Sequence, residues 1–596
     1  MKHTGQPFGH IVTLLILVSA LLLPCPAARA AIINVGCSVA ELVNAINTAN
    51  GAPAADTLEL SAGCNYTLTA INNDDPNHGP NGLPVITTDI TLNGYGATIG
   101  RSAAGGTPNF RIFQINNGGA LHLKRLTVSN GYVNHLFGGG FYNLGWLSIA
   151  NSTVSGHRSH GAGWYGGRGG AVYNDGGTVD VTNSVFSGNH AEQYGSGIYT
   201  NAGVLTVSGS TFTGHDVAFS GGAIMNWEGS ATVSSSAFSG NRADTGGAIG
   251  SCCDFASLSV TSSAFAGNSA HGSGGAIKHN TGGILAVTGS TFSGNNSDLW
   301  AGAISNSSTK ASVRNSTFSG NYAYESGGAL SNSGALAVAD SDFTGNYIDG
   351  SLSPCGGAIS DSGALVTVMD STFTDNSVVG AYGEGGAICA DGSRLSVAGS
   401  TFSGNFANAG GAAIRANSTV DVANSTFHAN TYNAIYVPGW RTVVVTNSTF
   451  SANSGTWGGA INNQAGSVTL KNTIIANSQG GTNCYNVTTD GGGNLRWPST
   501  DSTCFGAFGD PKLGALADNG GHTRTMALGS GSAAIDAGSN AICAAAPVNN
   551  LDQRRYTRPA DGDSNGSLVC DIGAYEAGAV SSVHLLFLPL VERQAQ

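Results

Sequence analysis

The sequence predicts an all-β protein: a right-handed parallel β-helix of about 16 coils, with a short N-terminal capping helix and a small C-terminal cap domain. Three observations lead to this prediction. A motif recurs at a nearly constant spacing, glycine supplies 90 of the 596 residues, and charged residues supply only 10%. Because 41% of the residues are apolar, the chain has the material for a folded core and is not expected to be disordered.

The repeated motif is centred on a phenylalanine. A valine stands five residues before each phenylalanine, a serine two before, and an asparagine three after, except that His215 follows one of them. The spacing varies only slightly from one copy to the next, and weaker copies surround Val128, Val154 and Ile474. The motif occurs at Phe186, Phe212, Phe238, Phe265, Phe292, Phe318, Phe343, Phe373, Phe402, Phe427 and Phe450. A second motif, G-G-A-I or a close variant, precedes most of these units.

The alternation within L-x-V and S-x-F indicates short β-strands. Strands this short cannot bury a core within one repeat, so neighbouring repeats must stack. When the chain coils, equivalent residues lie about 4.8 Å apart. Valine then packs on valine, phenylalanine on phenylalanine, and each asparagine amide donates to the asparagine of the next coil. The Gly-Gly pair lets the backbone turn at a corner of the coil.

Residues 1–30 are expected to be a signal peptide that is cleaved after Ala30. Lys2 precedes the apolar run "IVTLLILVSALLL" at 11–23, and "ARA" at 28–30 supplies small residues for cleavage. We therefore expect an exported protein, either secreted or associated with the cell surface. No transmembrane helix is expected in the mature chain. The net charge of −12 argues against nucleic acid as a partner.

The β-helix is predicted to span residues 31–505, with clear repeats over 120–480. Residues 37–50 show apolar residues at helical spacing after Ser38, a suitable N-cap, so a short helix is expected to cover the open N-terminal end. Residues 506–578 are expected to form the C-terminal domain, and 579–596 a tail that serves as a possible anchor. Within this domain we expect internal ion pairs among Asp552, Arg554, Arg558, Asp571 and Glu576.

Ten cysteines remain after the signal peptide, an even number that suits disulfides in an exported chain. Local spacing predicts Cys37–Cys64, Cys484–Cys504 and Cys543–Cys570. Cys355 and Cys389 are predicted not to pair, because their G-G-A-I motifs place them some five residues out of register. The state of Cys252 and Cys253 stays open. No C-x-x-C pair is present, so a structural zinc site is not expected. No other metal site and no cofactor are predicted.

The paired motifs G-G-A-[ILV] and F-x-x-N resemble the repeats of chlamydial polymorphic outer membrane proteins over roughly residues 120–480. The segments "DPKLGALADNGGHTRTMALGSGSAAIDAG" (510–538), "DQRRYTRP" (552–559) and "CDIGAYE" (570–576) resemble the choice-of-anchor Q domain of exported bacterial proteins. "FLPLVERQAQ" (587–596) is similar to short tails on such proteins. These resemblances imply export and surface display, and no defined activity.

Asp340 and Asp370 are the carboxylate pair that the register brings together. Each stands three residues before its phenylalanine in successive coils, so the two are predicted to stack. No basic residue shares their register, and the position is a corner where side chains bond locally. We therefore list them as catalytic candidates of low priority. A polysaccharide lyase or glycoside hydrolase acting on an acidic polysaccharide is the alternative function that they would serve.

The turn between F-x-x-N and the next G-G-A is longest after Asn346 and Asn376, in adjacent coils. This turn also carries aromatic and acidic residues, a combination that suits sugar rings. We predict that these residues share one side of the rod, which we call the lateral edge, and that they bind a ligand. They are Tyr324, Glu325, Tyr347, Asp349, Tyr382 and Glu384. The predicted function is binding or adhesion, to carbohydrate or another cell surface, by a monomer that is not expected to be an enzyme.

Overall fold

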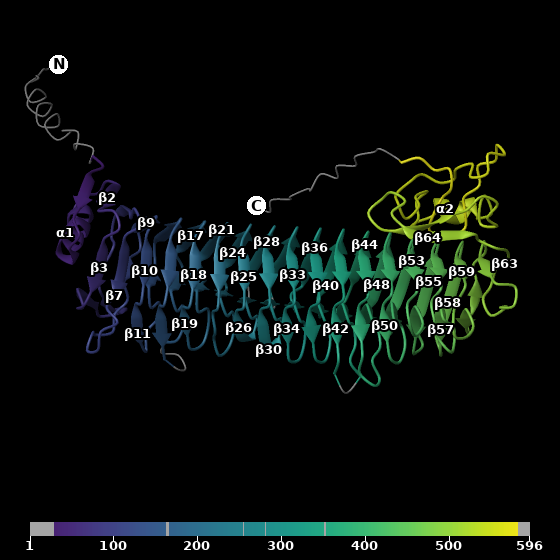
Figure 1. The fold of residues 1–596 in the computed structure, drawn as a ribbon, viewed down its shortest axis with the longest axis horizontal. Coiled ribbons are helices and arrows are strands. Elements are labelled where there is room, and N and C mark those ends of the chain that lie inside the picture. Colours follow the sequence, from purple (N-terminus) through teal and green to yellow (C-terminus); the bar gives the residue numbers. More distant parts are fainter. Residues whose placement is uncertain (1–28, 162–165, 254, 281, 351–352, 582–596) are drawn as a thin grey trace, which may run out of the picture.

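The computed structural model describes residues 29–161, 166–253, 255–280, 282–350 and 353–581. The chain folds into a right-handed parallel β-solenoid of about 17 turns, seen in Figure 1 as a long rod. The fold class is therefore as predicted. The signal peptide predicted for 1–30 lies almost wholly outside the described residues, as does most of the tail predicted for 579–596.

One coil contributes a strand to each side of the rod. In a representative coil these are β39 (Leu330–Asn332), β40 (Ala335–Ala339), β41 (Asp342–Thr344) and β42 (Tyr347–Ile348). Each strand pairs in parallel with its equivalent one turn later, so that Phe318 lies opposite Phe343. The register of the repeats is thus the one that the sequence predicts.

The stacked strands form long sheets that run the length of the rod (Figure 1). One sheet has 18 strands, from β1 (Ile32–Val35) to β61 (Thr489–Asp490); a second has 18, from β3 (Asn65–Leu68) to β63 (Ala507–Phe508); a third has 15, from β8 (Phe113–Ile115) to β60 (Cys484–Tyr485). The lateral edge has shorter sheets of three strands, from β11 (Tyr132–Asn134) to β19 (His190–Ala191), and seven, from β26 (Arg242–Thr245) to β50 (Phe406–Ala407).

The phenylalanines form one continuous column inside the rod. Phe318 is fully buried, and its ring lies 4.8 Å from that of Phe292 and 4.7 Å from that of Phe343. Rings along the column are stacked 4.5 to 5.0 Å apart. The strands that carry them are β18 (Val185–Ser187), β22 (Thr211–Thr213), β25 (Ala237–Ser239), β29 (Ala264–Ala266), β33 (Thr291–Ser293), β37 (Thr317–Ser319), β41, β45 (Thr372–Thr374), β49 (Thr401–Ser403), β53 (Thr426–His428) and β56 (Thr449–Ser451).

The asparagines form the predicted ladder beside this column. Asn321 Nδ2 donates to Asn346 Oδ1 at 2.9 Å, and Asn346 Nδ2 donates to Asn376 Oδ1 at 2.9 Å. Each amide also donates to a backbone carbonyl, as Asn346 does to Phe318 O at 3.0 Å. Because every polar atom of the buried amide has a partner, the ladder stabilises the corner without an unsatisfied group.

Helix α1 (Val39–Asn50) covers the N-terminal end of the rod (Figure 1). Ser38 Oγ accepts a hydrogen bond from Glu41 N at 3.2 Å, which caps the first turn as predicted. Leu42 and Ile46 on one face are fully buried against the first coils. The helix thus shields strand edges that would otherwise pair with other chains.

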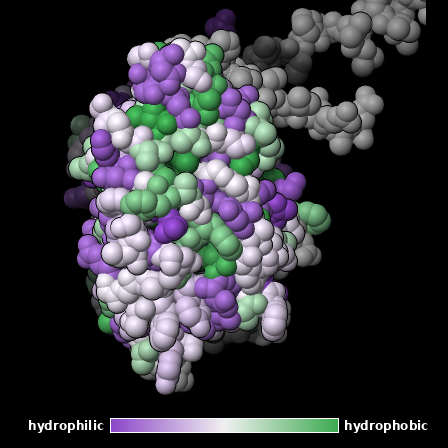
Figure 2. Space-filling model, turned by 90° about the vertical axis from the view of Figure 1, so that its right-hand side faces the viewer, coloured by the Kyte–Doolittle hydropathy of each residue, from purple (hydrophilic) through white to green (hydrophobic). Residues whose placement is uncertain are grey.

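The C-terminal domain contains the antiparallel strands β64 (Leu513–Ala517) and β65 (Thr525–Leu528) and the short helix α2 (Asn540–Ala544). It does not simply close the end of the rod; it folds back along the flank, above β53 and β59 (Ile474–Ala476) in Figure 1. Thr401 Oγ1 donates to Arg524 O at 2.6 Å, and Thr426 Oγ1 donates to Gln553 Oε1 at 2.6 Å. Seen from this end, polar and apolar residues interleave over the surface (Figure 2).

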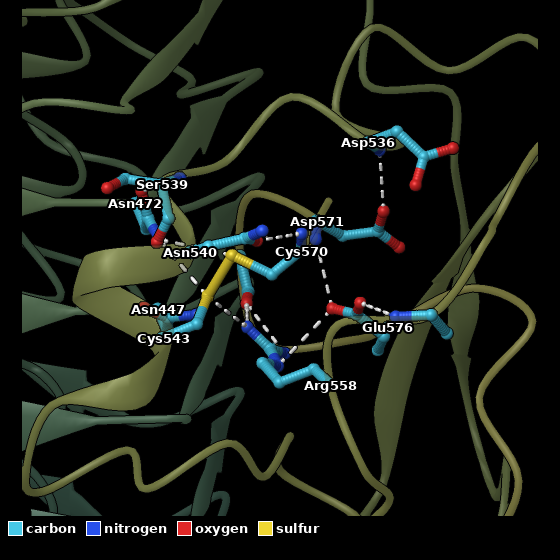
Figure 3. Close-up of a disulfide and its surroundings, with 12 residues drawn as sticks. Asn447, Asn472, Asp536, Ser539, Asn540, Cys543, Arg558, Cys570, Asp571 and Glu576 are labelled. Carbon is cyan, nitrogen blue, oxygen red and sulfur yellow. Dashed lines mark hydrogen bonds and ion pairs between the residues drawn. A yellow bond between two sulfur atoms is a disulfide. The ribbon is translucent and has the colours of Figure 1, made fainter. Parts of the chain in front are cut away.

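The interior of this domain is held by buried ion pairs, as predicted. Arg554 lies 2.6 Å from Asp552, and Arg558 lies 3.3 Å from Glu576, with all four side chains at most 4% exposed. Burial raises the pKa of Glu576 to about 7, against the opposing charge of Arg558. Figure 3 shows Arg558 and Glu576 beside the Cys543–Cys570 disulfide.

The disulfides Cys37–Cys64, Cys484–Cys504 and Cys543–Cys570 are present, as expected from their spacing. Figure 3 shows how the last of these lies close to the solenoid, where Asn447 Nδ2 donates to Cys543 Sγ at 3.2 Å. Among the described residues, no helix is long and apolar enough to cross a membrane.

The prediction that Cys355 and Cys389 do not pair was wrong: they form a disulfide with their Cα atoms 5.6 Å apart. The register is as expected, since Cys355 lies opposite Glu384 and Cys389 opposite Ser360. The five-residue step from Glu384 to Cys389 is not extended, however. Gly385 has φ of 67°, and a Cβ added to it would lie only 3.1 Å from the Cβ of Cys389. The glycine corner therefore folds five residues back on themselves.

Candidate functional site

The lateral edge is built from three successive coils. The strands β38 (Tyr322–Ala323), β42 and β46 (Ser377–Val378) lie side by side, so that Tyr347 is opposite both Tyr322 and Ser377. In Figure 1 this edge is the lower border of the rod, away from the C-terminal domain. Loops project from it near β42 and β50.

The tyrosines of this edge face solvent. Tyr324, Tyr347 and Tyr382 are 38%, 41% and 67% exposed. Glu325 and Asp349 are exposed as well. The six predicted residues therefore come from one side of the rod, and five of them are exposed to solvent.

Tyr322, which the sequence reasoning did not single out, joins this group. Its ring centroid lies 5.0 Å from that of Tyr347, and its hydroxyl donates to Asp349 Oδ1 at 2.7 Å. Partial burial and this carboxylate raise the pKa of Tyr322. The contact fixes an aromatic pair and a carboxylate in one arrangement across two coils. The signal in the sequence was present, since Tyr322 directly follows the ladder residue Asn321.

Glu384 differs from the other five. It is only partly exposed and forms an ion pair with Arg415, which also pairs with Asp391. Burial raises the pKa of Glu384, while Arg415 opposes that effect. The disulfide between Cys355 and Cys389 lies next to this network. Glu384 therefore helps to fix the base of the loops rather than facing solvent.

The low-priority pair Asp340 and Asp370 lies in successive coils as predicted. The inference from register alone that no basic residue helps these carboxylates was wrong, because basic partners reach both of them from outside the repeats. His522 Nδ1 lies 3.3 Å from Asp340 Oδ1, and Arg555 forms an ion pair with Asp370, which is 6% exposed. Both partners come from the C-terminal domain and are therefore far along the chain from the carboxylates that they contact. The two carboxylates thus take part in docking this domain on the solenoid.

A cleft of about 470 Å³ lies between this domain and the second sheet. Threonine and serine hydroxyls line one wall in register, with Thr344 opposite Thr374 and Thr374 opposite Ser403. His522 and Arg524 line the other wall. The cleft offers hydroxyl, imidazole and guanidinium groups, which are suited to hydrogen bonding with a polar ligand.

A group of carboxylates lies elsewhere in the C-terminal domain. Asp536, Asp561 and Asp563 place one oxygen each within 4.8 Å of one another. Oxygen ligands of this kind suit a hard cation such as Ca²⁺. The sequence "DGDSNG" at 561–566 spells the opening of a calcium loop, D-x-D-x-N-G, and is the signal by which these residues could have been found.

Comparison with known proteins gives limited matches. The sequence model of the Chlamydia polymorphic membrane protein repeat matches residues 315–333 and 370–391, which include part of the lateral edge. The search among curated proteins gives no match. Among solved structures, the tailspike protein of E. coli bacteriophage HK620 in complex with a pentasaccharide is 14% identical, with 77% of this chain and 74% of that chain covered and a TM-score of 0.29. A double mutant of this tailspike, also with pentasaccharide, is 13% identical over the same shares, with a TM-score of 0.27. These TM-scores are too low for fold or function to be transferred.

Proposed function

We propose that this chain is an exported, surface-associated protein that binds glycans through its lateral edge. The observation that carries the proposal is the ordered row of aromatic and acidic side chains over three coils, in which the tilted rings of Tyr322 and Tyr347 lie 5.0 Å apart and the Tyr322 hydroxyl donates to Asp349. Aromatic faces stack on sugar rings, and carboxylates accept hydrogen bonds from sugar hydroxyls. The rigid solenoid holds these groups in place before a ligand arrives.

The charge of this chain supports a neutral or weakly charged ligand. The net charge of −12 and the exposed carboxylates at Glu325 and Asp349 oppose binding of a strongly anionic chain. Neutral polysaccharides with several sugar units fit the row best, because successive coils present equivalent positions about 4.8 Å apart.

The alternative is cleavage of a polysaccharide in the cleft beside the C-terminal domain. Its support is that this domain places His522 and Arg555 next to the stacked carboxylates. We consider it the weaker function because Asp370 is almost fully buried in its ion pair and cannot reach a substrate. Binding without cleavage is therefore the expected behaviour.

The test is retention on a panel of immobilised neutral and acidic polysaccharides, with the soluble products analysed in parallel. Replacing Tyr347 and Tyr382 together with alanine should weaken binding by about 30-fold, the effect of losing about 2 kcal/mol of ring stacking. Trp440→Ala, which removes a side chain that is 90% exposed away from the edge, is the matched control. Unchanged binding by the double variant would refute the edge as the site. Products that disappear in Asp340→Asn would favour the enzyme instead.

A further inference from the structure

One corner of the solenoid differs from the corner of the coil before it. In the coil before it, Asn226 closes the corner, since its Nδ2 donates to Gly229 O at 3.0 Å and to Ser257 O at 3.1 Å. In β27 (Ile249–Cys252) the equivalent residue is Ser251. Its side chain accepts from Asn226 at 3.2 Å and is too short to span the corner as an amide does.

This corner is also longer. The step from Asn226 to Ser230 is four residues, whereas the step between their partners, Ser251 and Ser257, is six. The coil thus has two additional residues and lacks the amide that organises the corner in the preceding coil. Another interaction must hold the chain in place here, because a longer segment loses more conformational entropy on folding.

Two adjacent cysteines occupy this corner. Cys252 and Cys253 are present as thiols, with their sulfur atoms 2.8 Å apart. Cys253 has φ of 79°, a turn conformation that brings the two side chains to the same side. Cys252 is partly buried and lies opposite Trp227, which belongs to β23 (Ile224–Trp227) of the preceding coil. Burial raises the pKa of its thiol, and the Cys253 sulfur and the Glu228 carboxylate act in the same direction.

The other cysteines of the described residues are all in disulfides: eight of them form four bonds. An environment that oxidises four pairs also oxidises a fifth whose sulfurs are already close. We propose that Cys252 and Cys253 form a vicinal disulfide in the mature protein, which fixes the corner between β27 and β28 (Ser257–Thr261) in place of the asparagine. The inference rests on the proposed export of the chain to an oxidising compartment.

The bond forms by exchange with an external disulfide, such as oxidised glutathione. The Cys253 thiolate attacks one sulfur of that disulfide and releases the first small thiol, which leaves a mixed disulfide on Cys253. The Cys252 thiol, whose sulfur lies next to that of Cys253, then loses its proton and attacks Cys253 Sγ, and the second small thiol leaves. The protein pair loses two electrons and two protons, and one external disulfide becomes two thiols.

The test uses the full chain after oxidation in a glutathione buffer. The protein is unfolded in the presence of a thiol-alkylating reagent, digested without reduction, and analysed by mass spectrometry. We expect the peptide that contains Cys252 and Cys253 to carry no label and to be two hydrogens lighter than its dithiol form. Cys252→Ser and Cys253→Ser each leave one thiol there and should each take up one label.

A wild-type peptide with two labels, while the other four disulfides are intact, overturns the inference and leaves the proposed export untouched. Linkage of this peptide to another cysteine also overturns it.

The proposed role of the bond in the corner is tested by hydrogen exchange, which compares the wild type with the double serine variant. The amides of Ala256 and Ser257 donate to Cys253 O and Gly229 O at 3.0 Å, and in the variant we expect them to exchange at least tenfold faster. Equal exchange rates would show that the bond does not organise the corner.

Discussion

His215 allows the polar ladder to be tested by its response to pH. It stands where other coils have asparagine: its Nδ1 lies 3.0 Å from Asn241 Oδ1, and its Nε2 lies 3.4 Å from Asn189 Nδ2. A neutral imidazole satisfies both contacts, because Nδ1 donates and Nε2 accepts. Protonation would place a hydrogen on Nε2 facing the amide hydrogens of Asn189. Burial lowers the pKa of His215 to about 4.

The direction of the pH effect follows from this lowered value. Between pH 6.5 and about 4 the unfolded chain binds a proton at His215 that the folded chain does not, so the free energy of unfolding decreases as the pH falls through this window. The full effect is about 3 kcal/mol, and about 2 kcal/mol of it is lost by pH 5. The contribution is fully present above pH 6.5.

The perturbation is His215→Asn, which restores the ladder residue of the neighbouring coils. An asparagine has no proton to gain, so the variant should lose about 2 kcal/mol less than the wild type between pH 8 and pH 5. The assay is urea unfolding followed by circular dichroism across this range, with the difference between the two proteins plotted against pH. His271→Asn, at an imidazole whose side chain is 71% exposed, controls for removal of a histidine as such. A flat difference curve for His215→Asn would refute the ladder placement.

Three further variants test the packing. Phe318→Ala should reduce the free energy of unfolding by about 3–5 kcal/mol, because a cavity inside a stacked column cannot collapse; urea unfolding measures it, and Ser319→Ala is the control. Arg555→Ala should loosen the C-terminal domain by about 1 kcal/mol, seen as faster hydrogen exchange at the docking surface, while unchanged exchange would show that this half-exposed ion pair is dispensable. Replacing Cys355 and Cys389 with serine should cost about 2–4 kcal/mol, since the bond closes a loop across 34 residues; an unchanged melting temperature contradicts this.

The repeating features of the rod could be predicted because each is set by local spacing. Phe318 stacks between Phe292 and Phe343 since all three stand at the same place in successive copies of the repeat. The same holds for Asn346 in the ladder. A solenoid contacts mostly its own neighbouring turns, so the period alone defines nearly every contact inside it.

The remaining features depend on contacts that no period encodes. Arg555 reaches Asp370 from another domain, and the loop-rich segment that carries it has no repeat from which its position could be derived. The pairing of Cys355 with Cys389 depends on the path of the chain through a glycine corner, where a count of residues overestimates the distance. In both cases the place of the solenoid residue within its repeat was predictable. The path of the chain between such places, and the position of the C-terminal domain against them, was not.

These contacts divide the surface of the rod between two roles. On one flank the C-terminal domain covers Thr401 and Thr426, and both are buried. At the equivalent position of an uncovered coil, Thr317 is exposed. A flank that is packed against another domain leaves less open surface for a long glycan than the lateral edge does. The lateral edge has no such cover on the described residues of β42, and its longer loops cost little, because loop entropy grows only slowly with length. The internal column and ladder therefore supply the stability, so the side chains of the edge can differ from coil to coil, as the proposed glycan site requires.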